Sequence, residues 1–277
     1  MRFGLEILTI SEHLTDDKMN QTFKDLLARG LYFSSNRICF ERSIFLLGHM
    51  RCGSTALSNV LCSNVQVQGY GECHITYNRG FSPGRLALNL VRNRINPYSG
   101  KYIFDKVLHG SLDSAVDRKF FRSKAIFMLR NPLSSVTSLV KLSKYLNLKE
   151  YMTVDGALGY YTTRLQELEK LWEEFPVANR SFIGYEALVA NPQICLDRLS
   201  NGLLTGIKLN NEYSHNATLG HGRGDPLNAN KYRLISNMDE KEAATDGVRE
   251  QVRIAPRFED AEMLHQRLSV LFGTPLD

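Results

Sequence analysis

The chain has 277 residues, of which 43% are hydrophobic and 23% are charged, and its formal net charge is +5. This length suits one large α/β domain, and we take residues 1–277 as that domain. No apolar run approaches the roughly 20 residues that a membrane-spanning helix needs. The mild charge comes without the basic runs of a nucleic-acid surface. We therefore expect no membrane span and no nucleic-acid partner.

The first residues and the cysteines bear on the cellular compartment. The N-terminus is apolar only briefly, and Glu6 interrupts the stretch that a secretory signal requires. The five cysteines are scattered without a CxxC pair, which argues against a disulfide framework and against a zinc site. We expect free thiols, a cytoplasmic location and no bound metal.

Four short runs have the composition of buried strands. The first is almost wholly apolar and ends in glycine, and the others are rich in aromatic or β-branched residues. The four runs are 43–48, 101–106, 124–129 and 180–185.

Helical patterns alternate with these strands. Pro132 suits the first turn of a helix, and Leu165, Leu168 and Trp172 share one apolar stripe. The predicted helices begin near Ser54 or span 132–144, 155–175, 187–201 and 239–272. Alternation of this kind predicts a three-layer α/β fold, with a mostly parallel sheet flanked by helices and ligands bound beyond the carboxyl ends of its strands.

The segment 48–55 (GHMRCGST) leaves a predicted strand and opens a predicted helix. Successive backbone N–H groups and the helix dipole can converge on an anion there. The glycine spacing is that of a Walker A loop, but Ser54 stands where that loop has its lysine. A positive charge lies inside the loop instead, at Arg51, and Thr55 adds a second hydroxyl. An ordinary strand–turn–helix corner is the alternative interpretation of this segment.

A second anion motif closes the run 124–129. Arg130 follows that strand, and Ser138 lies eight residues further along the next helix. Both can turn toward the carboxyl edge of the sheet, where the arginine can bind one phosphate through two parallel hydrogen bonds.

With both motifs in order, the chain resembles the sulfotransferases that use 3′-phosphoadenosine 5′-phosphosulfate (PAPS). Their 5′-phosphosulfate loop reads roughly [KR]-S-G-T-[TS], and their 3′-phosphate motif reads R-x-P-x5-S. The corresponding residues here are Arg51, Cys52, Gly53, Ser54 and Thr55, then Arg130, Pro132 and Ser138. Cys52 replaces the usual serine and Ser54 the usual threonine.

The resemblance extends to a third segment and covers roughly residues 43–205. The stretch 182–188 (FIGYEAL) looks like the family's strand and Y-E-[DA]-L turn, so that Tyr185 is expected at the nucleotide pocket or in a buried structural position. The resemblance implies the P-loop-like sulfotransferase fold, PAPS as donor and no metal. Residues 206–277 are expected to form a lid and a packing helix.

Three residues are candidates for the chemistry, each just past a predicted strand end. The resemblance implies that Lys106 stabilises the bridging oxygen as the nucleotide leaves, with a surface pair to Asp105 as the alternative. The acceptor's proton needs a base. Glu72 is our first choice and His109, three residues after Lys106, is the second. His74 ranks third, since a lone loop histidine is more often structural.

A polar, glycine-rich loop at 220–226 is expected either to close over the nucleotide or to be a solvated connection. In the first case Arg223, Lys231 or Arg233 would meet the 3′-phosphate.

Two other functions stay open at this stage. One is a P-loop nucleotide kinase or NTPase, against which the missing loop lysine and the absence of an evident Mg²⁺-binding acidic strand end both argue. The other is a nucleotide-binding module without catalysis.

For a sulfotransferase, the expected acceptor is a small molecule or a glycan that carries a hydroxyl or amine. Aromatic and basic residues favour a polar or anionic acceptor such as a glycan, namely Tyr77, Arg79, Phe81, Arg85, Arg92 and Arg94. Both a monomer and a homodimer are compatible with the sequence.

Overall fold

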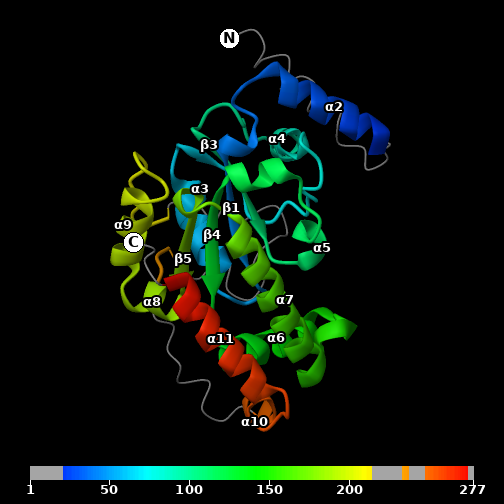
Figure 1. Ribbon diagram of the computed structural model, residues 1–277, viewed down its shortest axis with the longest axis vertical. Coiled ribbons are helices and arrows are strands. Elements are labelled where there is room, and N and C mark those ends of the chain that lie inside the picture. The colour runs from blue at the N-terminus through cyan, green and yellow to red at the C-terminus, as the bar shows by residue number, and fades with distance from the viewer. Residues whose placement is uncertain (1–20, 214–232, 237–246, 274–277) are drawn as a thin grey trace.

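The computed structural model describes residues 21–213, 233–236 and 247–273. Within them, five parallel strands form one sheet in the order β2-β3-β1-β4-β5 (Figure 1). The strands are β1 (Ser43–Gly48), β2 (Val67–Gln68), β3 (Tyr102–Val107), β4 (Lys124–Leu129) and β5 (Arg180–Gly184). The predicted α/β class is confirmed.

The strand predictions hold to within one residue. Runs 43–48 and 124–129 coincide with β1 and β4, whose side chains are almost all buried because helices pack on both faces of these two central strands. β3 begins and ends one residue later than predicted. β5 ends at Gly184, because Tyr185 already begins a helix.

Helices cover both faces of this sheet. The helices in the described residues are α2 (Gln21–Ser34), α3 (Ser54–Ser63), α4 (Ser82–Arg92), α5 (Gly110–Asp113), α6 (Pro132–Leu146), α7 (Val154–Glu174), α8 (Tyr185–Ala190), α9 (Pro192–Asn201), α10 (Gly247–Arg253) and α11 (Phe258–Gly273). Among these helices, none combines the length and the apolar character that crossing a bilayer requires.

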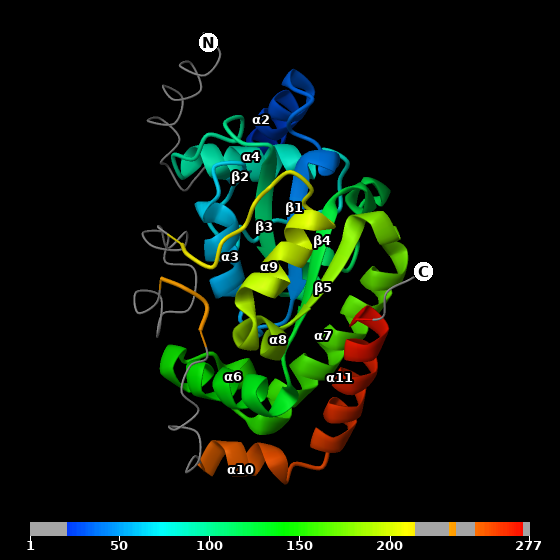
Figure 2. The ribbon, with the colours of Figure 1, turned by 90° about the vertical axis from the view of Figure 1, so that its left-hand side faces the viewer.

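The alternation of side chains along each strand builds two cores. Phe45 and Leu47 of β1 pack into a cluster with α6, α7 and α11, whereas Ile44 and Leu46 pack into a second cluster with α3 and α9. Figure 2 shows α3, α8 and α9 over one face of the sheet and α7 and α11 toward the other. The three predicted layers are therefore present.

Two predicted helices are interrupted at proline. The run 187–201 is not one helix, since Asn191 leaves helical geometry and Pro192 starts α9. The run 239–272 contains α10 and α11, with Pro256 in the break between them, and its first eight residues lie outside the described residues. The stripe of Leu165, Leu168 and Trp172 is buried as predicted.

The strand order determines where the loops meet. β1 lies between β3 and β4, and all three run parallel. The segments that follow these strands therefore emerge at one edge of the sheet. They carry both anion motifs and His109, and Lys106 lies at the same edge as the second-to-last residue of β3.

Candidate functional site

The loop from His49 to Gly53 connects β1 to α3 and has a strained backbone. Arg51 has φ 66° and Gly53 has φ 89°, both in the left-handed region. A Cβ on Gly53 would lie 2.4 Å from the ring of Tyr185, so that the loop approaches this ring more closely than any other residue type allows. Such a loop at a helix N-terminus directs backbone N–H groups toward an anion.

The side chains of this loop point in different directions. Arg51, Gly53, Ser54 and Thr55 line a cavity at the carboxyl edge of the sheet. Cys52 is fully buried, and burial raises the pKa of its thiol. The cysteine therefore packs inside the loop, where its backbone N–H donates to the carbonyl oxygen of His49 over 3.3 Å, and it does not line the cavity.

The second motif lies directly against the first. Arg130 follows β4, donates from Nη1 to the carbonyl oxygen of Arg51 over 3.2 Å and stacks 4.0 Å from the centroid of the Tyr185 ring. Ser138, on α6, accepts a 2.8 Å hydrogen bond from Nε of Arg51. The structure thus brings together two guanidinium groups, a hydroxyl and an aromatic face, although Ser138 contacts Arg51 of the first motif and not Arg130, with which the sequence had grouped it.

The Nε group of Arg130 offers a test of whether an anion fits. It is buried and has no hydrogen-bond partner among the described residues. A buried guanidinium N–H favours an anionic acceptor. Arg130 and Ser138 do not themselves line the cavity beside the first loop. Both contact Arg51, which does line it, so the two motifs adjoin each other.

His49 connects the two motifs and was not identified from the sequence. Its fully buried ring accepts a hydrogen bond at Nε2 from the backbone N–H of Arg130 over 3.2 Å. Because Nε2 accepts, the proton lies on Nδ1, which donates to the carbonyl oxygen of Met50 over 2.9 Å. Burial lowers the pKa of His49 to about 3, which keeps the ring neutral.

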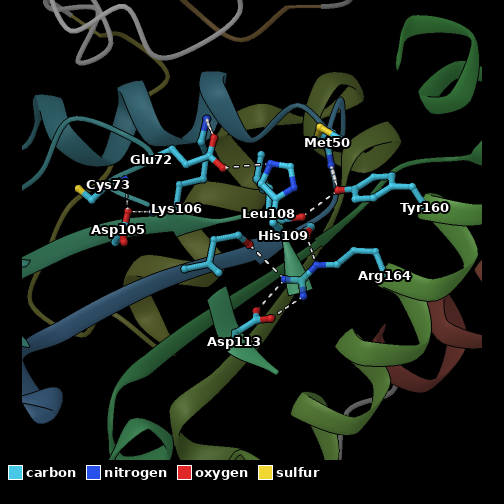
Figure 3. A network of polar contacts seen from close by, with 12 residues as sticks. Met50, Glu72, Cys73, Asp105, Lys106, Leu108, His109, Asp113, Tyr160 and Arg164 are labelled. Atoms are coloured by element: carbon cyan, nitrogen blue, oxygen red, sulfur yellow. Dashed lines mark hydrogen bonds and ion pairs between the residues drawn. The ribbon is translucent and has the colours of Figure 1, made fainter. Parts of the chain in front are cut away.

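Glu72 lies between Lys106 and His109 (Figure 3). Its Oε2 is 3.9 Å from Nζ of Lys106, and its Oε1 is 3.7 Å from Nε2 of His109. Lys106 is buried at the end of β3, whereas His109 is half-exposed just beyond it. All three side chains line the cavity of the first loop, so the sequence candidates for chemistry share one space. His74 is exposed and does not line it.

Asp105 anchors the segment that carries Glu72. Its buried carboxylate accepts from the backbone N–H groups of Cys73 and Lys106, each over 2.8 Å, and from the hydroxyl of Tyr77 over 2.5 Å. Burial raises the pKa of Asp105 to about 7. Asp105 is therefore not the surface partner of Lys106, which was the alternative interpretation of that pair.

Tyr160 and Arg164 of α7 form hydrogen bonds with the backbone at the end of β1 and in the segments that follow β1 and β3 (Figure 3). The Tyr160 hydroxyl accepts from the backbone N–H of Met50 and donates to the carbonyl oxygen of Leu108, both over 2.8 Å. The buried Arg164 pairs with Asp113 through two 2.7 Å hydrogen bonds and donates to Gly48, the last residue of β1, over 2.9 Å. The amphipathic pattern of α7 gave no signal for these contacts.

Several predicted positions have other surroundings. Tyr185 lines the cavity. Tyr213 and Ile235, which no motif in the sequence had pointed to, line it from the C-terminal third. Arg223 and Lys231 lie outside the described residues, and Arg233 is exposed.

The aromatic and basic set proposed for a glycan does not line the cavity. Tyr77 is buried on Asp105, and Arg79 and Arg85 form ion pairs with Asp25 of α2. That part of the sequence provides no argument for a glycan.

Neither a protein-family model nor a curated protein matches this sequence. Among solved structures, it is similar to the sulfotransferase domain of the olefin synthase from Synechococcus, with 15% identity, a TM-score of 0.53, and 84% of this chain and 95% of that domain covered. It is also similar to a sulfotransferase from Mycobacterium avium, with 11% identity, a TM-score of 0.53, and coverages of 92% and 83%. The chain has the α/β fold of sulfotransferases.

Proposed function

We propose that the protein transfers a sulfuryl group from PAPS to a hydroxyl or amine of a small acceptor. The observation that carries this proposal is the convergence of two anion sites with Lys106, Glu72 and His109 at one edge of the sheet. The shared fold with two sulfotransferases supports it. Ser54, in the position of the Walker lysine, argues against an NTPase.

The donor supplies an activated sulfuryl group whose leaving group is a nucleotide phosphate. In our proposal, the loop of Arg51, Ser54 and Thr55 binds the 5′-phosphosulfate, whereas Arg130 and Ser138 bind the 3′-phosphate. The Tyr185 ring lies against both motifs, because it contacts Gly53 and stacks under Arg130.

Transfer breaks the bond between sulfur and the 5′-phosphate oxygen and forms one between sulfur and the acceptor atom. Lys106 places a positive charge where negative charge grows on the leaving oxygen. Glu72 or His109 takes the acceptor's proton, and their 3.7 Å separation allows either one to orient the other.

The donor site is tested by calorimetric titration with 3′-phosphoadenosine 5′-phosphate (PAP) without Mg²⁺, with ATP and 5′-AMP as comparators. We expect tight binding that requires the 3′-phosphate. Arg130→Ala should weaken it by at least ~10-fold, since a charged hydrogen bond contributes about 1.5–3 kcal/mol. Arg198→Ala, an exposed change on α9, is the matched control. Preference for ATP with Mg²⁺ would contradict the proposal and favour the kinase class.

The catalytic role of Lys106 is tested by the release of PAP from PAPS in the presence of an acceptor. Lys106→Ala should lower turnover by about 10²-fold or more while the affinity for PAP stays within a few-fold, because the contact strengthens mainly in the transition state. Glu72→Gln and His109→Asn, assayed in parallel, identify the base as the variant with the larger loss. If the affinity for PAP fell as much as turnover, Lys106 would be a binding residue and not a catalytic one. Turnover unaffected by all three changes would remove these residues from the catalytic role, and binding of PAP without any turnover in the wild type would indicate a binding module.

A further inference from the structure

A second cavity adjoins the first and shares His109 with it. Its walls come from the start of α5, from the short 3₁₀ turn Lys149–Tyr151 and from one face of α7. Gly156 and Gly159 on this face of α7 contribute no side chains. The carbonyl oxygen of Glu150 fills the place of a Cβ at Gly156, whereas a Cβ at Gly159 would meet nothing closer than Nη1 of Arg257 at 3.6 Å, and that guanidinium pairs with Asp155. Because the wall between the cavities includes a candidate base, a molecule in the second cavity can present a reacting group to the first.

The charge in this cavity is negative. Glu150 and Glu167 line it, and among the described lining residues the only fixed cation is Arg164. Both terminal nitrogens of that guanidinium bind the carboxylate of Asp113, so its charge is already compensated, although Nη1 also lies 3.3 Å from Glu167. The carboxylates of Glu150 and Glu167 therefore face the space together with Arg164, and the buried carboxylate of Asp113 neutralises the charge of that arginine. This surplus favours a positively charged ligand.

Aromatic rings border the same space. The centroids of Tyr151 and Tyr160 are 5.2 Å apart at an interplanar angle of 60°, and Tyr160 in turn lies 6.1 Å from the His109 ring. Aromatic faces beside carboxylates are suited to ammonium groups, whose charge interacts with the ring quadrupole. The rings also lead from the acidic end of the cavity toward His109.

We propose that the second cavity binds the cationic end of the acceptor, which is an alcohol that also carries an amine. The ammonium group lies among Glu150, Glu167, Tyr151 and Tyr160, and the hydroxyl reaches His109 and Glu72. This inference rests on the proposed function and specifies the acceptor class. It replaces the anionic glycan suggested by the arginines of residues 79–94, since none of them lines either cavity described here.

The test uses pairs of alcohols that differ in charge but little in shape. Choline is compared with 3,3-dimethylbutan-1-ol, and glucosamine with N-acetylglucosamine, as acceptors with PAPS and as ligands of the complex with PAP. We expect the cationic member of each pair to have at least a ~10-fold higher kcat/KM and a correspondingly lower dissociation constant, the scale of about 1.4 kcal/mol or more for a partly desolvated cation.

Variants connect this preference to the cavity. Glu150→Gln and Glu167→Gln should each raise KM for the cationic member several-fold and reduce the preference, with kcat and the affinity for PAP little changed. Glu174→Gln, an exposed change at the end of α7, is the matched control and should behave as wild type. Glu150 is exposed and lies outside the Arg164 pair, so its variant remains informative if Glu167→Gln does not fold.

The outcomes separate this inference from the function on which it rests. If PAP binds but the neutral alcohols are preferred, or neither cationic probe binds, the acceptor class is overturned and the donor assignment stays in place. If a cationic preference survives both glutamate changes, the assignment of the cationic end to this cavity is overturned. Failure to bind PAP would overturn the proposed function and the acceptor class with it.

Discussion

At the scale of single residues, Asp105 and His49 show how buried ionisable groups hold the site in place. Asp105 fixes the segment of Glu72 through the N–H of Cys73, and His49 fixes Arg130 through its backbone N–H. Burial raises the pKa of Asp105 to about 7 and lowers that of His49 to about 3, so each favours its neutral form. Neither needs to contact a substrate in order to position Glu72 and Arg130, which we propose to contact one.

The raised pKa of Asp105 predicts a dependence of stability on pH. The unfolded chain loses this proton near pH 4 and the native protein only near pH 7, so the free energy of unfolding falls as pH rises between these values, by at most about 1.4 kcal/mol per unit. Asp105→Asn keeps an oxygen for the backbone N–H groups but has no proton to lose. We expect the variant to gain stability relative to wild type from pH 4 to 7 and then to level off.

Urea unfolding at several pH values measures this difference. His49 is present in both proteins, so its opposite trend, a loss of stability as pH falls below about 6.5, cancels in the comparison. Asp260→Asn, an exposed change on α11, should leave the wild-type profile unchanged. Parallel profiles for wild type and Asp105→Asn would show that Asp105 is already ionised throughout this range.

At the scale of elements, α3 and α8 meet at one glycine. Gly53 has a left-handed backbone directly before α3, and the ring of Tyr185, the first residue of α8, occupies the space where a Cβ would lie. The same ring supports Arg130. The geometry of both anion motifs thus depends on the absence of a side chain at one position.

Gly53→Ala should disturb both motifs together. The left-handed backbone costs roughly 1–2 kcal/mol with a Cβ, and the ring of Tyr185 must also move. We expect the affinity for PAP to fall by about 10-fold or more, together with a lower stability, measured by calorimetry and by urea unfolding. Gly184→Ala is the matched control, since it lies beside Tyr185 with φ −75° and its Cβ would meet nothing closer than 3.8 Å. Equal affinities of the two variants would contradict this role of Gly53.

At the scale of the whole molecule, the local features were predictable and the long-range pairs were not. The four buried runs and the spacing of Arg130 and Ser138 are local patterns, so four of the five strands of the sheet could be predicted from them, whereas the two-residue edge strand β2 is too short to give such a pattern. Asp113 and Arg164 are 51 positions apart, and their pairing depends on how α5 and α7 pack. Tyr213 and Ile235 reach the cavity from a part of the chain with no periodic pattern, where the sequence pointed to basic residues such as Arg223 and Arg233 and not to these two.

Tyr160 contacts both the loop proposed for the donor and the cavity proposed for the acceptor. It holds the backbone of the donor loop at Met50 and that of Leu108, while its ring borders the cavity assigned to the acceptor. A ligand that shifts this ring therefore acts on the donor loop as well. By thermodynamic reciprocity, whatever factor the acceptor exerts on the affinity for the nucleotide, the nucleotide exerts on the acceptor. A single hydroxyl thus gives the fold a path by which occupancy of one cavity alters the affinity of the other.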